Sequence, residues 1–435
     1  MTFRTLLILL FFTQLFFIQC EKGIIESKLG QATLSAEFIA ANTIWLTLKT
    51  ETPKGEKKVS IFQNDSLIDS FVLQKSDTIY KVSNLREASE YTFQAIYTIS
   101  NSLTYSSNLI LVNTEKLSSS NIVWQDMVVS EIGAGLLDVE YLIENNIFAV
   151  GYFLHEDQFY NALNYDNLNF NYEQIPILAW GSTDSSFGHS LLSKIVPINT
   201  HEYWVSNGAE FMYYNGNSWG NWQFLFKDFN DPLFGEVKDT WIGAPDYIWA
   251  VGDKGSIYHY DGNFWSRANS PTKENIRSIA GSYIEEKLQL VIGGLNFLFY
   301  KNGNSEWQDV FDTVLGRYNF LYKNTLHARF FNADNLFIAV WADGETHLYR
   351  INPGNLKNAI HLGSYPEWCS DMIVLGNNDI FFIGNSRIFH YDGNIIFSFP
   401  IINNADYYEA IASYENEIAI VGQRSQIALI LTGTR

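Results

Sequence analysis

Cysteine is nearly absent from this sequence, which has 435 residues and only Cys20 and Cys369. Two cysteines cannot supply a disulfide framework or a cysteine zinc site, so neither accounts for the stability of the protein. Cys369 follows Trp368 in an apolar stretch, a setting that predicts a buried, inert thiol. The fold must therefore be held by the packing of apolar side chains.

Positive charge is also scarce, because 28 Lys and Arg residues face 47 Asp and Glu residues, for a net charge of −19. A nucleic-acid partner would need a basic stripe to neutralise phosphates, and this balance excludes one. The acidic residues form no long run, which indicates that the negative charge is spread over a solvated surface. Calcium or a basic partner remains an alternative reading of the same charge.

Long apolar runs are limited to Leu6–Ile18, which has 13 residues, whereas a membrane-spanning helix needs roughly 20. The run follows Arg4 and ends just before Cys20, which is typical of a signal peptide. It resembles a bacterial lipoprotein signal, although Gln19 stands where that family has a small residue. The resemblance implies that residues 1–20 form a lipoprotein-type signal that is cleaved before Cys20, and that Cys20 is lipidated and becomes the mature N-terminus. We expect an envelope lipoprotein of the outer membrane or cell surface, with simple secretion or an uncleaved anchor as alternatives.

Nucleotide, zinc-protease and dinucleotide signatures are missing as well. The sequence contains no H-E-x-x-H, no G-x-x-x-x-G-K-[ST], and no G-x-G-x-x-G after a strand. We therefore predict no cofactor and no metal, and the sequence leaves open whether the protein is an enzyme, with the balance against it.

The sequence is instead rich in short strands, with 16% aromatic residues, 29 Gly and 17% charged residues, which favours an all-β protein. After a linker at 21–31, residues 32–115 contain about seven strand-like segments. This number of strands is typical of an immunoglobulin-like sandwich. Trp45 on the second segment, and Leu85 followed by Tyr91-x-Phe93-x-Ala95, resemble the buried tryptophan and the tyrosine corner of fibronectin type III domains. The resemblance implies a spacer module.

Beyond a second linker at 116–121, residues 122–435 are built from a repeated unit that is clearest in Tyr247–Trp265. The unit is an apolar strand, a turn with glycine, a second aromatic strand ending in Asp-Gly or Asn-Gly, and an aromatic opening the next strand. Its apolar strand recurs seven times, with fourth positions at 150, 206, 251, 292, 340, 383 and 421. The spacing is typical of four-stranded propeller blades, so we expect seven blades, with six or eight as alternatives.

The two ends of this repeat array predict how the ring closes. The last repeat ends with residues 426–432 and lacks an outer strand, while residues 122–128 precede the first repeat with no partner. Their Trp124-Gln125-Asp126 matches Trp307-Gln308-Asp309 in the outer strand of another repeat. Residues 122–128 should therefore pair with 426–432 and remove two exposed sheet edges.

The Trp-Ala-Val-Gly unit with its following Tyr-Asp-Gly and Trp resembles the repeats of secreted bacterial propellers, and is similar to the kelch and photosystem-assembly-factor groups. The resemblance implies the architecture of residues 122–435 and leaves the activity open.

Candidate ligand-binding residues lie in the turns after each repeated apolar strand, which we interpret as turns between the two inner strands of each blade. The charged residues in or beside these turns include Glu210 and the nine that we take as candidates: His155, Glu156, Asp157, Asp253, Lys254, Asp343, Glu345, Arg387 and Arg424. Carboxylates and cations gathered on one face of the propeller, near its axis, could bind a sugar or a peptide terminus. The alternative is that each is a solvated turn residue.

The sequence thus predicts a monomeric, membrane-tethered envelope protein whose propeller binds a carbohydrate, peptide or protein partner. One alternative is a carbohydrate-active enzyme with its acids among Asp157, Asp253 and Glu345. Another is an envelope-assembly scaffold.

Overall fold

The computed structural model describes residues 28–51, 55–99, 103–132, 135–176, 190–225, 235–284, 286–316, 324–400 and 406–435. The expected signal peptide (1–20), its Cys20 and most of the 21–31 linker lie outside these residues. Among the residues described, no helix has the length and apolarity to cross a membrane. The chain divides into two compact units, residues 1–39 with 43–114, and residues 40–42 with 115–435.

The first unit contains eight strands. They are β1 (Lys28–Ile39), β2 (Ile44–Thr50), β3 (Lys57–Gln63), β4 (Ser66–Leu73), β5 (Asp77–Val82), β6 (Glu90–Ile99), β7 (Leu103–Ser107) and β8 (Ile110–Asn113). Their pairing order is β4-β3-β6-β7-β1-β2-β5, with β8 on β6, and β1 meets β7 in parallel. The strands enclose one core that includes Leu46, Val59 and Phe93. Alternation of apolar and polar residues, as along β6, puts one side of each strand into this core.

Two aromatic residues of this unit have defined positions. Trp45 is buried and packs beside Phe38, with ring centroids 5.4 Å apart. The Tyr91 hydroxyl accepts a hydrogen bond from the Arg86 backbone N–H at 2.8 Å. Tyr91 thus ties the start of β6 to the chain five residues earlier.

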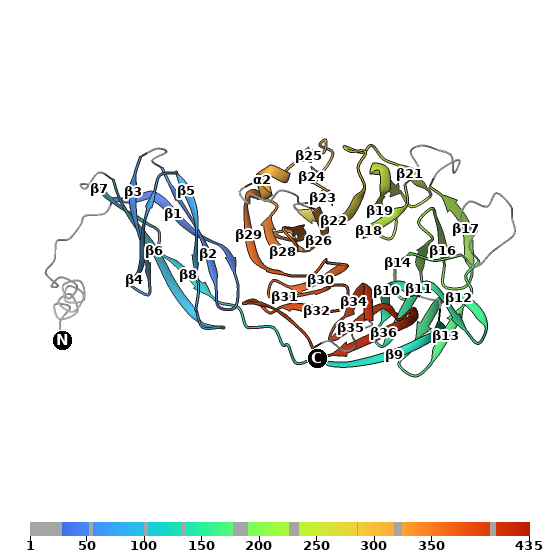
Figure 1. The fold of residues 1–435 in the computed structure, drawn as a ribbon. Helices are drawn as coiled ribbons and strands as arrows, with labels where there is room; N and C mark the ends of the chain where they lie inside the picture. Colours follow the sequence, from blue (N-terminus) through green and yellow to red (C-terminus); the bar gives the residue numbers. More distant parts are fainter. Residues whose placement is uncertain are drawn as a thin grey trace, which may run out of the picture. The chain divides into compact units, whose positions relative to one another are not determined.

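The second unit is a β-propeller of seven four-stranded sheets (Figure 1). Blades 1 to 3 are β10 (Gly135–Ile143) to β13 (Phe170–Glu173), β14 (Lys194–Pro197) to β17 (Trp219–Phe224), and β18 (Val237–Ala244) to β21 (Trp265–Arg267). Blades 4 to 6 are β22 (Ile276–Ile284) to β25 (Gln308–Asp309), β26 (Asn324–Asn332) to β29 (Asn355–Tyr365), and β30 (Asp371–Gly376) to β33 (Ile396–Ser398). Blade 7 consists of β34 (Asp406–Tyr414), β35 (Glu417–Arg424), β36 (Ile427–Thr434) and β9 (Val123–Ile132). The predictions of an all-β chain and of seven blades are confirmed.

The second strands of the blades are the repeated apolar strands of the sequence. They are β11 (Asn146–His155), β15 (Tyr203–Ser206), β19 (Tyr247–Gly252), β23 (Lys287–Gly294), β27 (Asn335–Ala342), β31 (Asp379–Ile383) and β35. Their residues are almost entirely buried, because each sheet is covered on both faces by its neighbours. Seven apolar clusters fill the seven junctions between successive blades. The blades are therefore held together by a continuous ring of packed side chains.

Strand β9 closes the ring by pairing antiparallel with β36. Asp126 pairs with Leu431 and Val123 with Thr434, which confirms the predicted closure. Arg424 of β35 reinforces the join, with its Nη1 atom 2.8 Å from Asp126 Oδ2 and its Nη2 atom 3.1 Å from Asp406 Oδ2. The first and last segments of the propeller thus share one sheet and one ion-pair network.

Candidate functional site

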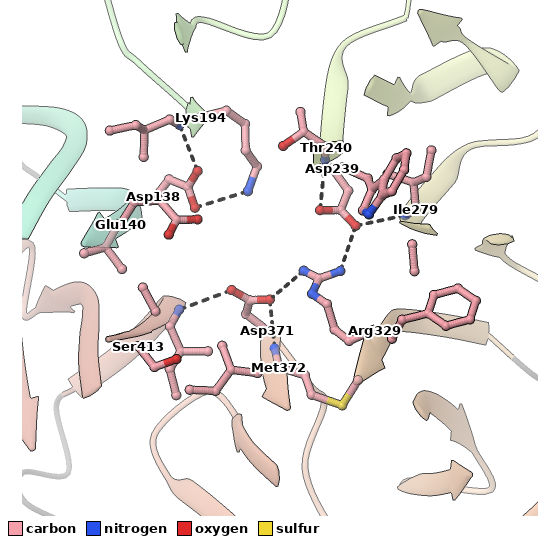
Figure 2. Close-up of a pocket in the computed structure, with 18 of the residues that line it drawn as sticks. Asp138, Glu140, Lys194, Asp239, Thr240, Ile279, Arg329, Asp371, Met372 and Ser413 are labelled. Carbon is pink, nitrogen blue, oxygen red and sulfur yellow. Dashed lines mark hydrogen bonds and ion pairs between the residues drawn. The ribbon is translucent and has the colours of Figure 1, made fainter. Parts of the chain in front are cut away.

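The first strand of each blade contributes to one cavity of about 310 Å³ at the centre of the propeller. Its charged lining residues are Asp138, Glu140, Lys194, Asp239, Arg329 and Asp371. They come from β10, β14, β18, β26 and β30, and Figure 2 shows them converging on one space. Because all seven innermost strands line this cavity, it is the central channel of the ring.

Seven equivalent positions encircle the channel: Asp138, Lys194, Asp239, Ser278, His327, Asp371 and Ala410. Four of them accept a hydrogen bond from a backbone N–H of the next blade. Asp138 bonds the Ile195 N–H at 2.9 Å, Asp239 the Ile279 N–H at 2.9 Å, Ser278 the Ala328 N–H at 2.8 Å and Asp371 the Ile411 N–H at 3.2 Å. In each case the N–H donor is the residue directly after the equivalent position in the next blade, as Ile195 directly follows Lys194. These four side chains therefore join neighbouring blades, and the three aspartates among them also line the channel.

A β-bulge recurs beside this ring. The register between the first and second strands shifts just before Asp138, Asp239, Ser278, His327 and Ala410. A bulge re-aims the following side chain and strengthens the local twist. The repeated bulge explains how similar side chains reach the neighbouring blade around a closed ring.

Arg329 links three blades inside the channel (Figure 2). Its Nη1 atom lies 3.0 Å from Asp239 Oδ2 and its Nη2 atom 3.2 Å from Asp371 Oδ1. The three residues belong to blades 5, 3 and 6 respectively. A planar guanidinium suits such a bridge, because its N–H donors are fixed in direction. On the other side of the channel, Lys194 Nζ lies 3.4 Å from Asp138 Oδ1.

The charges of the channel shift one another's protonation. Burial raises the pKa of Asp239, but the nearby Arg329 and Lys194 outweigh it, and the pKa is lowered overall. Burial raises the pKa of Asp138 beyond what the attraction of Lys194 offsets. Burial lowers the pKa of Lys194, and the three channel aspartates reverse this and raise it. Lys194 and Arg329 are thus fully charged at neutral pH.

Glu140 is the exception among the channel carboxylates. Burial, followed by the charges of Asp138 and Asp371, raises its pKa to about 8. Among the described residues, no hydrogen bond engages its carboxyl group, and the residue is partly exposed to the channel. At neutral pH most of the Glu140 population is therefore protonated, and this side chain is available to a ligand.

The residues predicted from the sequence lie elsewhere, in the turns between the second and third strands of the blades. The interpretation that these turns join the two inner strands of each blade was wrong. They join the second and third strands, counted outward from the channel. The cause is that charged residues, such as Asp138 and Glu140 in β10, interrupt the apolar residues of the first strands, so these strands lack the continuous apolar run that marks the second strands. None of the nine residues lines the central cavity.

The cluster of His155, Glu156 and Asp157 forms the turn between β11 and β12 (Gln158–Tyr165). Glu156 and Asp157 have φ angles of 49° and 62° and are exposed, so both shape a tight hairpin turn. The His155 ring stacks on Tyr172 with centroids 4.0 Å apart. The structure does not bring other predicted site residues to them.

The other predicted residues have local partners. Asp253 Oδ2 lies 3.6 Å from Lys238 Nζ, and the Lys254 backbone N–H donates to Asn275. Glu345 accepts a hydrogen bond from the Ser364 hydroxyl at 2.6 Å.

Asp343 is an exposed turn residue with a φ of 51°. Arg387 Nε lies 3.1 Å from Glu367 Oε1. Arg424 belongs to the closing network of blade 7.

Two further findings concern reactive groups. Cys369 is fully buried, as predicted, and burial raises the pKa of its thiol to about 12, so the thiolate is scarcely formed at neutral pH. Among the described side chains, no group of three or more histidines, cysteines or carboxylates is arranged to hold a metal ion.

Comparison with known proteins places the fold. No family model matches the chain, and no curated protein matches it in sequence. Among solved structures, the chain is similar to YCF48 bound to D1 peptide, with 12% identity and a TM-score of 0.51, over 74% of this chain and all of that one. This likeness supports the propeller fold and no more, because the identity is low.

Two other solved propellers match more weakly. One is the extracellular domain of a one-component system from B. thetaiotaomicron, with 12% identity and a TM-score of 0.49 over 70% of this chain and 39% of that one. The other is the WD40 propeller domain of Doa1, with 10% identity and a TM-score of 0.48 over 72% of this chain and 97% of that one.

Proposed function

We propose that this chain is an exported, lipid-tethered envelope protein whose propeller binds a peptide or protein partner through a cationic group placed in the central channel. The observation that carries the proposal is the charge of the channel. Four carboxylates, those of Asp138, Glu140, Asp239 and Asp371, face two cations, Lys194 and Arg329. Subtracting four from two gives a net charge of −2 when Glu140 is ionised and −1 when it is protonated. A lysine or arginine side chain, or an amino terminus, complements that charge.

Glu140 is the residue that would meet the cation. The three aspartates already accept backbone hydrogen bonds from the next blade, whereas the Glu140 carboxyl has no such bond among the described residues. A cation beside Glu140 favours its ionised form, so binding would release a proton near pH 7. His327, Lys194 and Arg329 do not change charge between pH 7 and 9, because the pKa of His327 is lowered and those of the two cations are raised.

Binding is favoured over catalysis because most of the channel carboxylates have a structural role. Asp138, Asp239 and Asp371 are engaged in holding neighbouring blades together, which leaves Glu140 without a second free carboxylate for paired acid–base chemistry. The turns that carry Glu156, Asp157 and Asp343 are exposed, and we propose them as further contacts for a larger partner.

The remaining parts of the proposal concern location. The signal-like residues 1–20 and Cys20 support export and lipidation. The strand order of the first unit and the hydrogen bond from the Arg86 N–H to the Tyr91 hydroxyl support a fibronectin type III-like spacer. A short tether at 21–31 and this spacer would present the propeller at the membrane surface.

The test is a peptide array probed with the full chain, followed by calorimetric titration of a selected peptide. We expect Lys- or Arg-containing peptides to be selected, with affinity that rises between pH 6 and 9 and proton release at pH 7. Glu140→Gln should weaken binding about tenfold, because a charge pair worth about 1.4 kcal/mol is lost. The exposed Glu274 offers a matched control, Glu274→Gln, which should bind normally. Selection of acidic peptides, or unchanged binding by Glu140→Gln, would refute the channel as the site.

A further inference from the structure

A groove between blades 3 and 4 has no role in the channel proposal. It encloses about 950 Å³ and is lined by residues of β19, of the β22–β23 hairpin, and of β24 (Phe297–Asn302) and the turn that follows it. One wall is aromatic, with Tyr247, Trp249 and Tyr283. The lining also includes a polar rim, formed by Asn302, Asn304 and Gln308. Blades 3 and 4 are neighbours in the ring (Figure 1).

The aromatic wall follows from the alternation along β19. Tyr247 and Trp249 lie two residues apart, so both side chains are on the face of the strand that meets blade 4, where they join the core between the two blades. Ile248 and Ala250 point to the opposite face and pack against blade 2. Tyr283 reaches the same wall from blade 4 and is 49% exposed. Its ring is therefore a platform open to solvent.

The tryptophan of this wall has an unused polar group. Trp249 is 9% exposed, and its indole Nε1–H has no hydrogen-bond partner among the described atoms. Behind it, the His259 ring packs 4.5 Å from both Trp249 and Tyr247, which fixes the two aromatic rings in place. The Nε1 atom is shielded from solvent, so this wall would contribute to binding through the packing of its fixed rings rather than through the indole N–H.

The polar rim supplies complementary groups. Among the described residues, no hydrogen bond engages the side-chain amides of Asn302, Asn304 and Gln308. Each amide carries two donors and an acceptor. Ser305 and Lys301 are used within the turn, because the Asn302 backbone N–H donates to the Ser305 hydroxyl at 3.1 Å and Lys301 donates to the Ser305 carbonyl. The turn is thus internally braced while its amides stay available.

We propose that this groove binds a neutral saccharide. Sugar rings present a C–H face that packs on aromatic rings and an edge of hydroxyls that both donate and accept hydrogen bonds. The lining of the groove offers both kinds of group, aromatic rings and amides, within the usual size range of ligand sites. The charged residues at the rim, Glu286, Lys287 and Lys301, carry a combined charge of only +1, so hydrogen bonds and aromatic packing, rather than charge, would dominate the recognition of a ligand. A proline-rich peptide would use the aromatic wall but would leave most of the amides unpaired.

The experiment probes the full chain against an array of neutral glucan, xylan, mannan and galactan oligosaccharides, together with proline-rich peptides. The hexasaccharide of the best class is then titrated by calorimetry. We expect one saccharide class to bind. Tyr283→Ala should lose about tenfold in affinity through the missing platform, and Asn304→Ala should lose severalfold. Both residues are exposed, so both variants should keep the melting temperature of the parent.

Tyr407 is an exposed tyrosine of blade 7, and Tyr407→Ala is the matched control that should bind like the parent. The inference is overturned if no saccharide binds, if the proline-rich peptides bind in a manner that depends on Tyr283, or if Tyr283→Ala and Tyr407→Ala bind equally well. These outcomes are independent of the channel, because Glu140→Gln should leave saccharide affinity unchanged.

Discussion

Replacing Arg329 by methionine is the sharpest test of how the channel is held together. The substitution keeps most of the side-chain volume and removes the guanidinium that lies 3.0 Å from Asp239 and 3.2 Å from Asp371. Two largely buried carboxylates then lose their shared cation. Breaking a buried ion pair by removing one partner costs about 3–5 kcal/mol. Arg329 is 28% exposed and both aspartates keep backbone hydrogen bonds, so we expect a loss of about 2–3 kcal/mol.

The measurement is urea unfolding at pH 7, followed by tryptophan fluorescence. Of the 12 tryptophans, 11 lie in residues 122–435 and only Trp45 lies before them, so the signal reports the propeller. Arg267→Met, at an exposed arginine of β21, is the control and should change the free energy of unfolding by less than about 0.5 kcal/mol. The double variant Asp239→Asn with Arg329→Met should recover about 1 kcal/mol, because one unpaired buried charge is removed.

The same substitution predicts a dependence on pH. The folded-state pKa of Asp239 is lowered, so its contribution to stability is present above the ordinary aspartate pKa and is lost as the pH falls through the folded value. In Arg329→Met that lowering disappears and the aspartates can take up protons. The stability gap between parent and variant should therefore narrow from pH 7 to pH 4. A variant as stable as the parent at pH 7, or a double variant no better than the single one, would refute this account of the channel.

Two further predictions concern the ends of the chain. Deleting residues 121–128 removes most of the partner of β36 and should lower the melting temperature of the propeller by more than about 10 °C, measured by calorimetry; an unchanged melting temperature would disprove the closure. Cys20→Ala should abolish the incorporation of radiolabelled palmitate into the protein in its host cell, whereas unchanged labelling would disprove lipidation of Cys20.

The blades could be predicted from the sequence because their second strands carry a strong signal. Each is buried on both faces, so it appears as a short apolar run such as Ile147–Gly151 or Ile380–Gly384, and the run repeats at the period of one blade. The closing strand could be predicted from the same period. The last repeat lacks an outer strand, and residues 122–128 form an extra strand before the first repeat.

The channel could not be predicted in this way, because charged residues such as Asp138, Asp239 and Asp371 interrupt the apolar residues of the innermost strands, and these polar residues look like ordinary surface positions. A positional signal does exist. Asp138, Asp239 and Asp371 each lie 12 residues before the fourth residue of their blade's apolar strand, at 150, 251 and 383. The offset arises because each aspartate pairs with that residue across the hairpin. The groove between blades 3 and 4 left no such signal, because its residues come from separate hairpins.

The pairing of β9 with β36 sets the order in which this protein can mature. About 300 residues separate the two strands in sequence, and loop closure over such a distance is slow. A chain that emerges from a ribosome or an export channel amino end first must hold β9 unpaired until the last hairpin arrives. Products truncated before β36 never acquire the joined sheet, and their open edges are exposed to proteases. The closed ring therefore forms only after the last hairpin of the chain has been made.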